Sequence, residues 1–239
     1  TFTGHAGSVW GIDYSAFDDC QLICSGSEDI TVRVWDFENN KQIQSFNGHL
    51  GGVYCVKFSP YHYHNHRRNV ICSSSYDKTI RFWDIKENQQ FNIFNGHTDH
   101  VIGIEFSPFN SGRYLCSGSF DKTICLWDVE TSKSLHAFNG HTNYVWCVNF
   151  SPLQSNNNNG NKINNVGVIG GDKTICTWDI ETTKQLTVFK GHTDAVGSVK
   201  YGLNELGNTI LSGADDKSVR LWDILSGKQI QVFDGHKHW

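Results

Sequence analysis

The feature that most constrains the fold of this chain is an internal repeat. The dipeptide Gly-His begins at positions 4, 48, 96, 140, 191 and 235, and Trp-Asp begins at positions 35, 83, 127, 178 and 222. Consecutive members of each series lie 44 to 51 residues apart. A repeat of this length predicts an array of small supersecondary units, each of which buries its apolar surface against the next.

Each repeat contains the pattern of four short strands. Runs of β-branched and aromatic residues alternate with clusters of Gly, Ser, Asp and Asn, as in the segments VIGIEF, YLCSGS, TICLW and SLHAF of the third repeat. No segment shows helical periodicity over ten or more residues, so the sequence predicts an all-β fold. Four-stranded sheets repeated around an axis form a propeller. We therefore expect five complete blades, at residues 8–46, 52–94, 100–138, 144–189 and 195–233.

The repeated motifs resemble those of the WD-repeat (WD40) family. The pattern is GH, then VxxVxFSP, then SGSxDKTIRxWD, and it covers the chain from Thr1 to Trp239. The resemblance implies a β-propeller of four-stranded antiparallel blades, most often seven in a ring. The partial units at residues 1–5 and 235–239 then lead us to expect an excerpt of a larger ring. The resemblance also implies a protein-protein scaffold or adaptor that is not an enzyme and needs no cofactor.

The resemblance further implies a structural hydrogen-bonding set of His, Ser, Asp and Trp in each blade. The sets are His5, Ser25, Asp29 and Trp35; His49, Ser73, Asp77 and Trp83; His97, Ser117, Asp121 and Trp127; His141, Asp172 and Trp178; and His192, Ser212, Asp216 and Trp222. The fourth set has Val168 in place of serine, so we expect that blade to be the least stable, because its buried donors lose a partner. A hydrolase triad is the competing interpretation, but a triad is unique and this set recurs.

Composition and charge exclude several other classes. The net charge of -4, with no run of five basic residues, disfavours nucleic acid as a partner. No apolar stretch is long enough for a membrane span and no signal peptide is evident, so we expect a protein of the cytoplasm or nucleus. Seven of the eight cysteines fall at matching positions of the repeat and form no CxxC clip, which predicts reduced core cysteines and no metal site.

The length variation of the repeats falls in one loop type, in the second and fourth units. The insertion of the second repeat, Tyr61 to Arg68, contains His62, His64 and His66 at alternate positions. On an extended strand these side chains would lie on one side, where they could bind a metal ion. We favour a solvated loop, since loops lack the supporting hydrogen bonds that metal sites need. The insertion of the fourth repeat, Gln154 to Asn165, is Asn-rich and is interpreted as a spacer.

The first strand of each repeat carries the clearest functional signal. Its apolar residues fall at offsets 0, 3 and 5, as in Val53, Val56 and Phe58, so we expect a bulge that turns the residue after the first Val outward. We predict that these outward residues form a partner-binding surface together with the residues just before the Asp of each turn between the second and third strands. Its members are Trp10, Tyr54, Tyr76, Ile102, Phe120, Tyr144, Trp146, His100, Glu28 and Asp215. Such a surface suits a peptide or loop with a basic residue.

Two alternatives remain open at this point, and a third is not supported. The aromatic residues of that surface could instead seal the mouth of a central channel. The chain could be the regulatory or substrate-recruiting module of a larger enzyme or complex. A catalytic propeller would need a unique acid or nucleophile cluster, and the sequence contains none, so we expect no small-molecule substrate.

Overall fold

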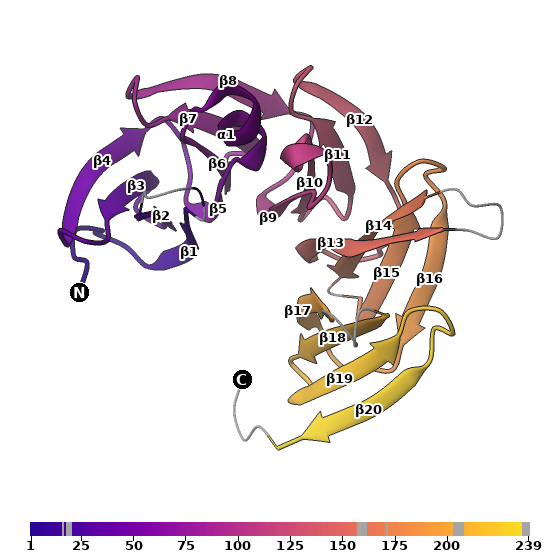
Figure 1. Cartoon of the computed structure of the whole chain (residues 1–239). Helices are drawn as coiled ribbons and strands as arrows, with labels where there is room; N and C mark the ends of the chain where they lie inside the picture. The colour runs from indigo at the N-terminus through magenta and orange to yellow at the C-terminus, as the bar shows by residue number, and fades with distance from the viewer. Residues whose placement is uncertain (16, 18–20, 157–161, 171, 203–207, 236–239) are drawn as a thin grey trace. The chain divides into compact units, whose positions relative to one another are not determined.

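Five antiparallel sheets of four strands succeed one another along the chain (Figure 1). The structure is a computed structural model that describes residues 1–15, 17, 21–156, 162–170, 172–202 and 208–235. The strands are β1 (Val9–Tyr14), β2 (Leu22–Ser27), β3 (Thr31–Asp36), β4 (Lys41–Asn47), β5 (Val53–Phe58), β6 (Val70–Ser75), β7 (Thr79–Asp84), β8 (Gln89–Asn95), β9 (Val101–Phe106), β10 (Tyr114–Ser119), β11 (Ile124–Asp128), β12 (Lys133–Phe138), β13 (Val145–Asn156), β14 (Lys162–Gly170), β15 (Thr174–Asp179), β16 (Gln185–Lys190), β17 (Val196–Tyr201), β18 (Thr209–Ala214), β19 (Ser218–Asp223) and β20 (Gln229–Asp234). The all-β prediction is confirmed.

The expected bulge is present in the first strand of four sheets. The pairing register shifts between Val9 and Gly11, between Val53 and Cys55, between Val145 and Cys147, and between Val196 and Ser198. The residue inside each shift is left out of the ladder, as the offsets of 0, 3 and 5 predict. In three of these four sheets the bulge therefore frees an aromatic side chain at the end that carries the Gly-His turn, namely Trp10, Tyr54 or Trp146, whereas the fifth sheet has Gly197 there.

The contacts of the chain divide it into two compact units, which are described separately. Unit 1 comprises residues 1–115 and 126–135, and unit 2 comprises residues 116–125 and 136–239. In unit 1 the sheets β1–β4 and β5–β8 share an apolar core, and Gly26 lies where the two sheets approach each other. A Cβ atom at Gly26 would lie 2.6 Å from Val53 Cγ1 and 2.9 Å from Val56 Cγ1, so only glycine lets the two sheets approach.

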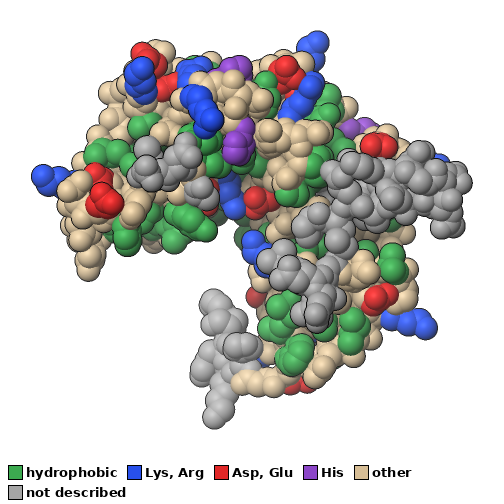
Figure 2. Space-filling view, viewed as in Figure 1, with side chains coloured by type: hydrophobic (Ala, Val, Ile, Leu, Met, Phe, Trp, Pro, Cys, Tyr) green, Lys and Arg blue, Asp and Glu red, His purple; other side chains and the backbone are tan. Residues whose placement is uncertain are grey.

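The apolar face of the first strand differs from its counterpart in the second sheet. Val53, Val56 and Phe58 are buried, at 0–4% exposed, because they pack on the sheet β1–β4. The corresponding residues of β1 are Val9, Ile12 and Tyr14, which are 47%, 72% and 70% exposed. Hydrophobic side chains accordingly gather over β1 in Figure 2.

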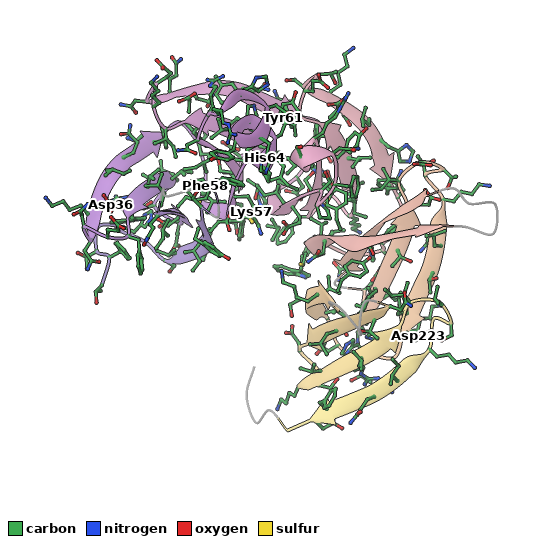
Figure 3. The ribbon with its side chains drawn as sticks, viewed as in Figure 1. Asp36, Lys57, Phe58, Tyr61, His64 and Asp223 are labelled. Carbon is green, nitrogen blue, oxygen red and sulfur yellow. The ribbon has the colours of Figure 1, made fainter. Side chains whose placement is uncertain are left out.

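The insertion of the second repeat contains a short helix, α1 (Pro60–His66), so the prediction of a loop is wrong, although residues 64–68 are exposed as predicted. Pro60 occupies the first turn of the helix, and Arg67 ends it in the left-handed region at φ 52°. Figure 3 places Tyr61 and His64 on this helix, next to Lys57 and Phe58 at the end of β5. Tyr61 and His62 are buried, and His62 Nδ1 lies 2.8 Å from Ser59 Oγ. Seven residues are too few to show helical periodicity in the sequence.

The insertion of the fourth repeat is an extended hairpin along part of its length, and its interpretation as a spacer stays a prediction. Gln154 pairs with Asn164 and Asn156 pairs with Lys162 in the ladder between β13 and β14. Residues 157–161 of the insertion lie outside the described residues.

The described residues hold no group of three His, Cys, Asp or Glu side chains arranged to bind a metal ion. Among them, too, there is no helix with the length and hydropathy needed to cross a membrane.

Candidate protein-interaction surface

A hydrogen-bonded chain of four side chains fixes the Gly-His turn to the second sheet. His49 Nδ1 lies 2.8 Å from Asp77 Oδ2, His49 Nε2 lies 2.7 Å from Ser73 Oγ, and the Trp83 indole donates to Ser73 Oγ at 2.7 Å. Since Nδ1 donates to the carboxylate, Nε2 accepts from the Ser73 hydroxyl. Burial lowers the pKa of His49 below its usual value, which is consistent with this neutral form.

The same chain of contacts recurs in the first and fifth sheets. His5 lies 2.9 Å from Asp29 and 2.7 Å from Ser25, and Trp35 donates to Ser25 at 2.7 Å. In the fifth sheet His192 lies 2.8 Å from Asp216 and from Ser212, and Trp222 donates to Ser212 at 2.8 Å. In the third sheet His97, Ser117 and Trp127 are buried, with the two rings 6.2 Å apart.

The fourth sheet departs from this arrangement. His141 Nδ1 lies 2.9 Å from Asp172 Oδ2, but the buried Nε2 atom has no hydrogen-bond partner, which serine supplies in the first, second and fifth sheets. Burial lowers the pKa of His141, yet the hydrogen bond with Asp172 and the neighbouring Cys176 raise it further, so that the pKa rises to about 9. The pKa of the histidine in the fourth sheet is thus shifted upward, whereas burial lowers the pKa of His49 in the second sheet and of His192 in the fifth.

An aromatic cluster lies at the Gly-His end of unit 1. The bulge in β1 turns Trp10 outward, where its ring stacks on Tyr54 at 4.6 Å between centroids and 17° between planes. Tyr76, in the turn after β6, packs 4.9 Å from Tyr54 and 4.0 Å from His100. Trp10 and Tyr76 remain 38% and 37% exposed. Burial and a hydrogen bond with Tyr76 raise the pKa of Tyr54, so its hydroxyl stays protonated.

Two glycines of the adjoining loop set the position of this cluster. A Cβ atom at Gly51 would lie 2.6 Å from Tyr76 Cβ, and one at Gly52 would lie 2.5 Å from Trp10 Cζ3. The loop therefore packs directly against the two rings, and any larger residue would displace them. The cluster is held rigidly, which limits the entropy lost when a partner binds.

A second aromatic cluster lies in unit 2. Phe120, in the turn after β10, stacks on Tyr144 with centroids 4.1 Å apart and planes at 16°, and meets the edge of Trp146 at 5.1 Å. Tyr144 is 41% exposed and Trp146 is 37% exposed. Exposed, mutually packed aromatic rings of this kind are typical of protein-binding sites.

Comparison with known families agrees with the repeats. A family model described as "WD domain, G-beta repeat" matches residues 1–36, 40–84, 88–128, 132–179 and 183–223. The chain belongs to the WD-repeat family. WD-repeat proteins generally act as interaction scaffolds in complexes.

Several curated WD-repeat proteins are similar to short parts of this chain. A transcription initiation factor TFIID subunit 5 of Caenorhabditis elegans is 41% identical over 59 residues, which is 25% of this chain and 9% of that protein. The human peroxisomal targeting signal 2 receptor is 39% identical over 57 residues, covering 24% and 18%. Subunit I of eukaryotic translation initiation factor 3 from Candida glabrata is 41% identical over 61 residues, covering 25% and 16%. Each match thus spans less than a fifth of the relative.

The remaining residues of the predicted WD-repeat surface have different environments. Ile102 is only 9% exposed, so its assignment to the outward set is wrong: the side chain is buried, and its carbonyl accepts from the Ser74 hydroxyl. Glu28 is exposed beside β1, and its backbone amide donates to the Ser8 carbonyl. Asp215 is exposed in the turn before β19. Whether a side chain after the first Val is buried depends on its neighbours, which the offsets alone do not predict.

Two exposed apolar residues at the same end of unit 1 were not predicted from the sequence. Leu50 is 86% exposed in the loop that follows His49, and Ile30 is 45% exposed in the turn between β2 and β3. The signal that could have found them is a comparison between repeats. Ala6, Thr98, Thr142 and Thr193 stand at the positions corresponding to Leu50, and Lys78, Lys122, Lys173 and Lys217 stand at those corresponding to Ile30.

Proposed function

We propose that this WD-repeat chain is a non-enzymatic scaffold that binds a peptide or loop of a partner protein at its Gly-His turns. The observation that carries the proposal is the packed, partly exposed cluster of Trp10, Tyr54 and Tyr76. Trp and Tyr dominate interface hot spots because they bury a large area at a small entropy cost. The bulges of β1 and β5 place two of these rings outside the sheet ladder, where a partner can reach them.

The exposed Glu28 supports the proposal that the partner segment carries a basic residue. Its Cα atom would lie 3.5 Å from a Cβ atom at Gly52, the residue that also abuts Trp10, while its carboxylate accepts from the Ser8 amide at 3.4 Å. A cation placed there gains from both groups. The buried His-Ser-Asp sets support a structural function for those residues, because Ser73 is 0% and His49 2% exposed and a substrate could not reach them. We place the protein in the cytoplasm or nucleus, where transcription and translation initiation factors such as its relatives act.

The proposal is tested by substitution of one ring in each cluster. Affinity capture with the full-length protein first identifies a partner, whose dissociation constant is then measured directly. Tyr54→Ala and Trp146→Ala should each weaken binding by roughly 2 kcal/mol or more, about thirtyfold, with little change in melting temperature. Phe37→Ala is the matched control, since Phe37 is a 56% exposed aromatic residue in the turn after β3, at the other end of the sheet. If both variants bind the partner normally, the two aromatic clusters are not its binding site.

A further inference from the structure

In two repeats a lysine ties the turn between the second and third strands to the next Gly-His loop. Lys78 Nζ donates to the Thr98 carbonyl at 2.8 Å in unit 1, and Lys173 Nζ donates to the Thr193 carbonyl at 2.7 Å in unit 2. In both cases the threonine follows the lysine by 20 residues. The two positions are therefore neighbours across adjoining loops, within reach of one lysine side chain.

The first repeat places two aliphatic residues at these positions. Ile30 stands where the other four repeats have lysine, and Leu50, 20 residues later, stands where the threonine would be. This exchange removes an ammonium group from the Gly-His end of unit 1 and leaves two apolar side chains exposed, at 45% and 86%. The pair consequently adds apolar surface that the fold itself does not bury.

Ile30 also adopts a backbone conformation that is unfavourable for its side chain. Its φ is 65°, in the left-handed region, where the corresponding lysines have φ of 67° to 71°. A β-branched side chain is strained there more than a lysine. The same turn conformation holds a lysine in the other four repeats, so the turn itself does not require isoleucine, and 45% of the Ile30 surface is left exposed.

The pair adjoins the aromatic cluster. The Leu50 amide donates to the Asp77 carboxylate at 3.0 Å, next to Tyr76, and Leu50 precedes the two glycines that abut Tyr76 and Trp10. Ile30 lies two residues after the exposed Glu28. Apolar side chains, aromatic rings and the Glu28 carboxylate thus adjoin one another, and the lysine of the other repeats is missing at position 30, while Lys78 directly follows Asp77 and donates to the Thr98 carbonyl of the next loop.

We propose that Ile30, Leu50, Trp10 and Tyr76 form an apolar docking patch for a bulky aliphatic or aromatic residue of the partner segment, with Glu28 pairing with a basic residue beside it. This rests on the proposed function and specifies the partner chemistry for unit 1. The patch selects against acidic and wholly polar segments, because they would meet Glu28 or leave the apolar surface uncovered.

The probe is a displayed library of random hexapeptides, selected on the wild-type chain and on the variants Ile30→Lys and Leu50→Thr, which restore the residues of the other repeats. Peptides enriched on the wild type should carry a bulky apolar residue near Arg or Lys. Synthesised and measured by fluorescence anisotropy, such a peptide should bind each variant at least fivefold more weakly. Ile43→Lys and Leu225→Thr are matched controls, since these residues are 46% and 75% exposed on β4 and in the turn before β20.

The variants separate docking from folding. Ile30→Lys relieves the β-branched strain, so its melting temperature should equal or exceed that of the wild type while its binding falls. Enrichment of polar or acidic peptides, no enrichment at all, or equal affinity for both variants would overturn the apolar patch. If Tyr54→Ala abolishes peptide binding while Ile30→Lys and Leu50→Thr do not, the proposed function stands and only this inference fails.

Discussion

Replacing Ser73 by alanine tests whether the buried side-chain network holds the second sheet together. The Ser73 hydroxyl accepts from the Trp83 indole and bonds to His49 Nε2, both at 2.7 Å. All three residues are buried, at 0%, 2% and 2% exposed, so water cannot replace the lost hydroxyl without a rearrangement. Each buried polar group left without a partner costs about 1–3 kcal/mol, and two such groups predict a loss of about 4 kcal/mol in the free energy of unfolding.

Ser74→Ala is the matched control for this substitution. Ser74 is also 0% exposed, but its hydroxyl makes a single long hydrogen bond of 3.4 Å to the Ile102 carbonyl. The loss of one such bond costs about 1 kcal/mol or less. Urea-induced unfolding followed by circular dichroism, at neutral pH and with the slopes compared, measures both variants. If Ser73→Ala costs no more than Ser74→Ala, the network is not what stabilises the sheet.

Two further predictions concern His141 and the helix α1. The pKa of His141 is about 6.5 when unfolded and about 9 when folded, so the stabilisation from its pair with Asp172 is complete below pH 6.5 and is lost as the pH rises through 9. Unfolding measured from pH 6 to pH 10 should show a fall on the order of 3 kcal/mol in the free energy of unfolding, and this fall should be absent in His141→Gln. If the curves of the wild type and the variant are parallel, the ion pair is refuted. Tyr61→Ala should cost about 3 kcal/mol, because the ring is 8% exposed, whereas the exposed His64→Ala should change stability by less than about 0.5 kcal/mol. Equal thermal melting of these two variants would mean that the helix does not pack.

The bulges and the candidate site differ in how far the sequence could predict them. The offsets of Val53, Val56 and Phe58 were sufficient to predict the bulge, because the alternation of side chains in a strand is a local rule. They could not predict that Ile102 folds inward while Trp10 stays partly exposed, because that depends on which neighbours fill the space. The stacking of Trp10 on Tyr54 joins residues 44 positions apart, and no pattern within one repeat encodes it.

The sequence by itself determined the repeat, the four-stranded sheets, the family and the residues of the His-Ser-Asp-Trp sets, because each follows from a pattern that recurs at a fixed spacing. Only the tertiary structure decided the features that occur once. These are the helix over Pro60–His66, the raised pKa of His141 and the exposure of Ile30 and Leu50. The physical reason is that recurring features reflect local backbone geometry and one repeated packing problem. Burial, ionisation and exposure of single residues depend instead on neighbours brought together from distant parts of the chain.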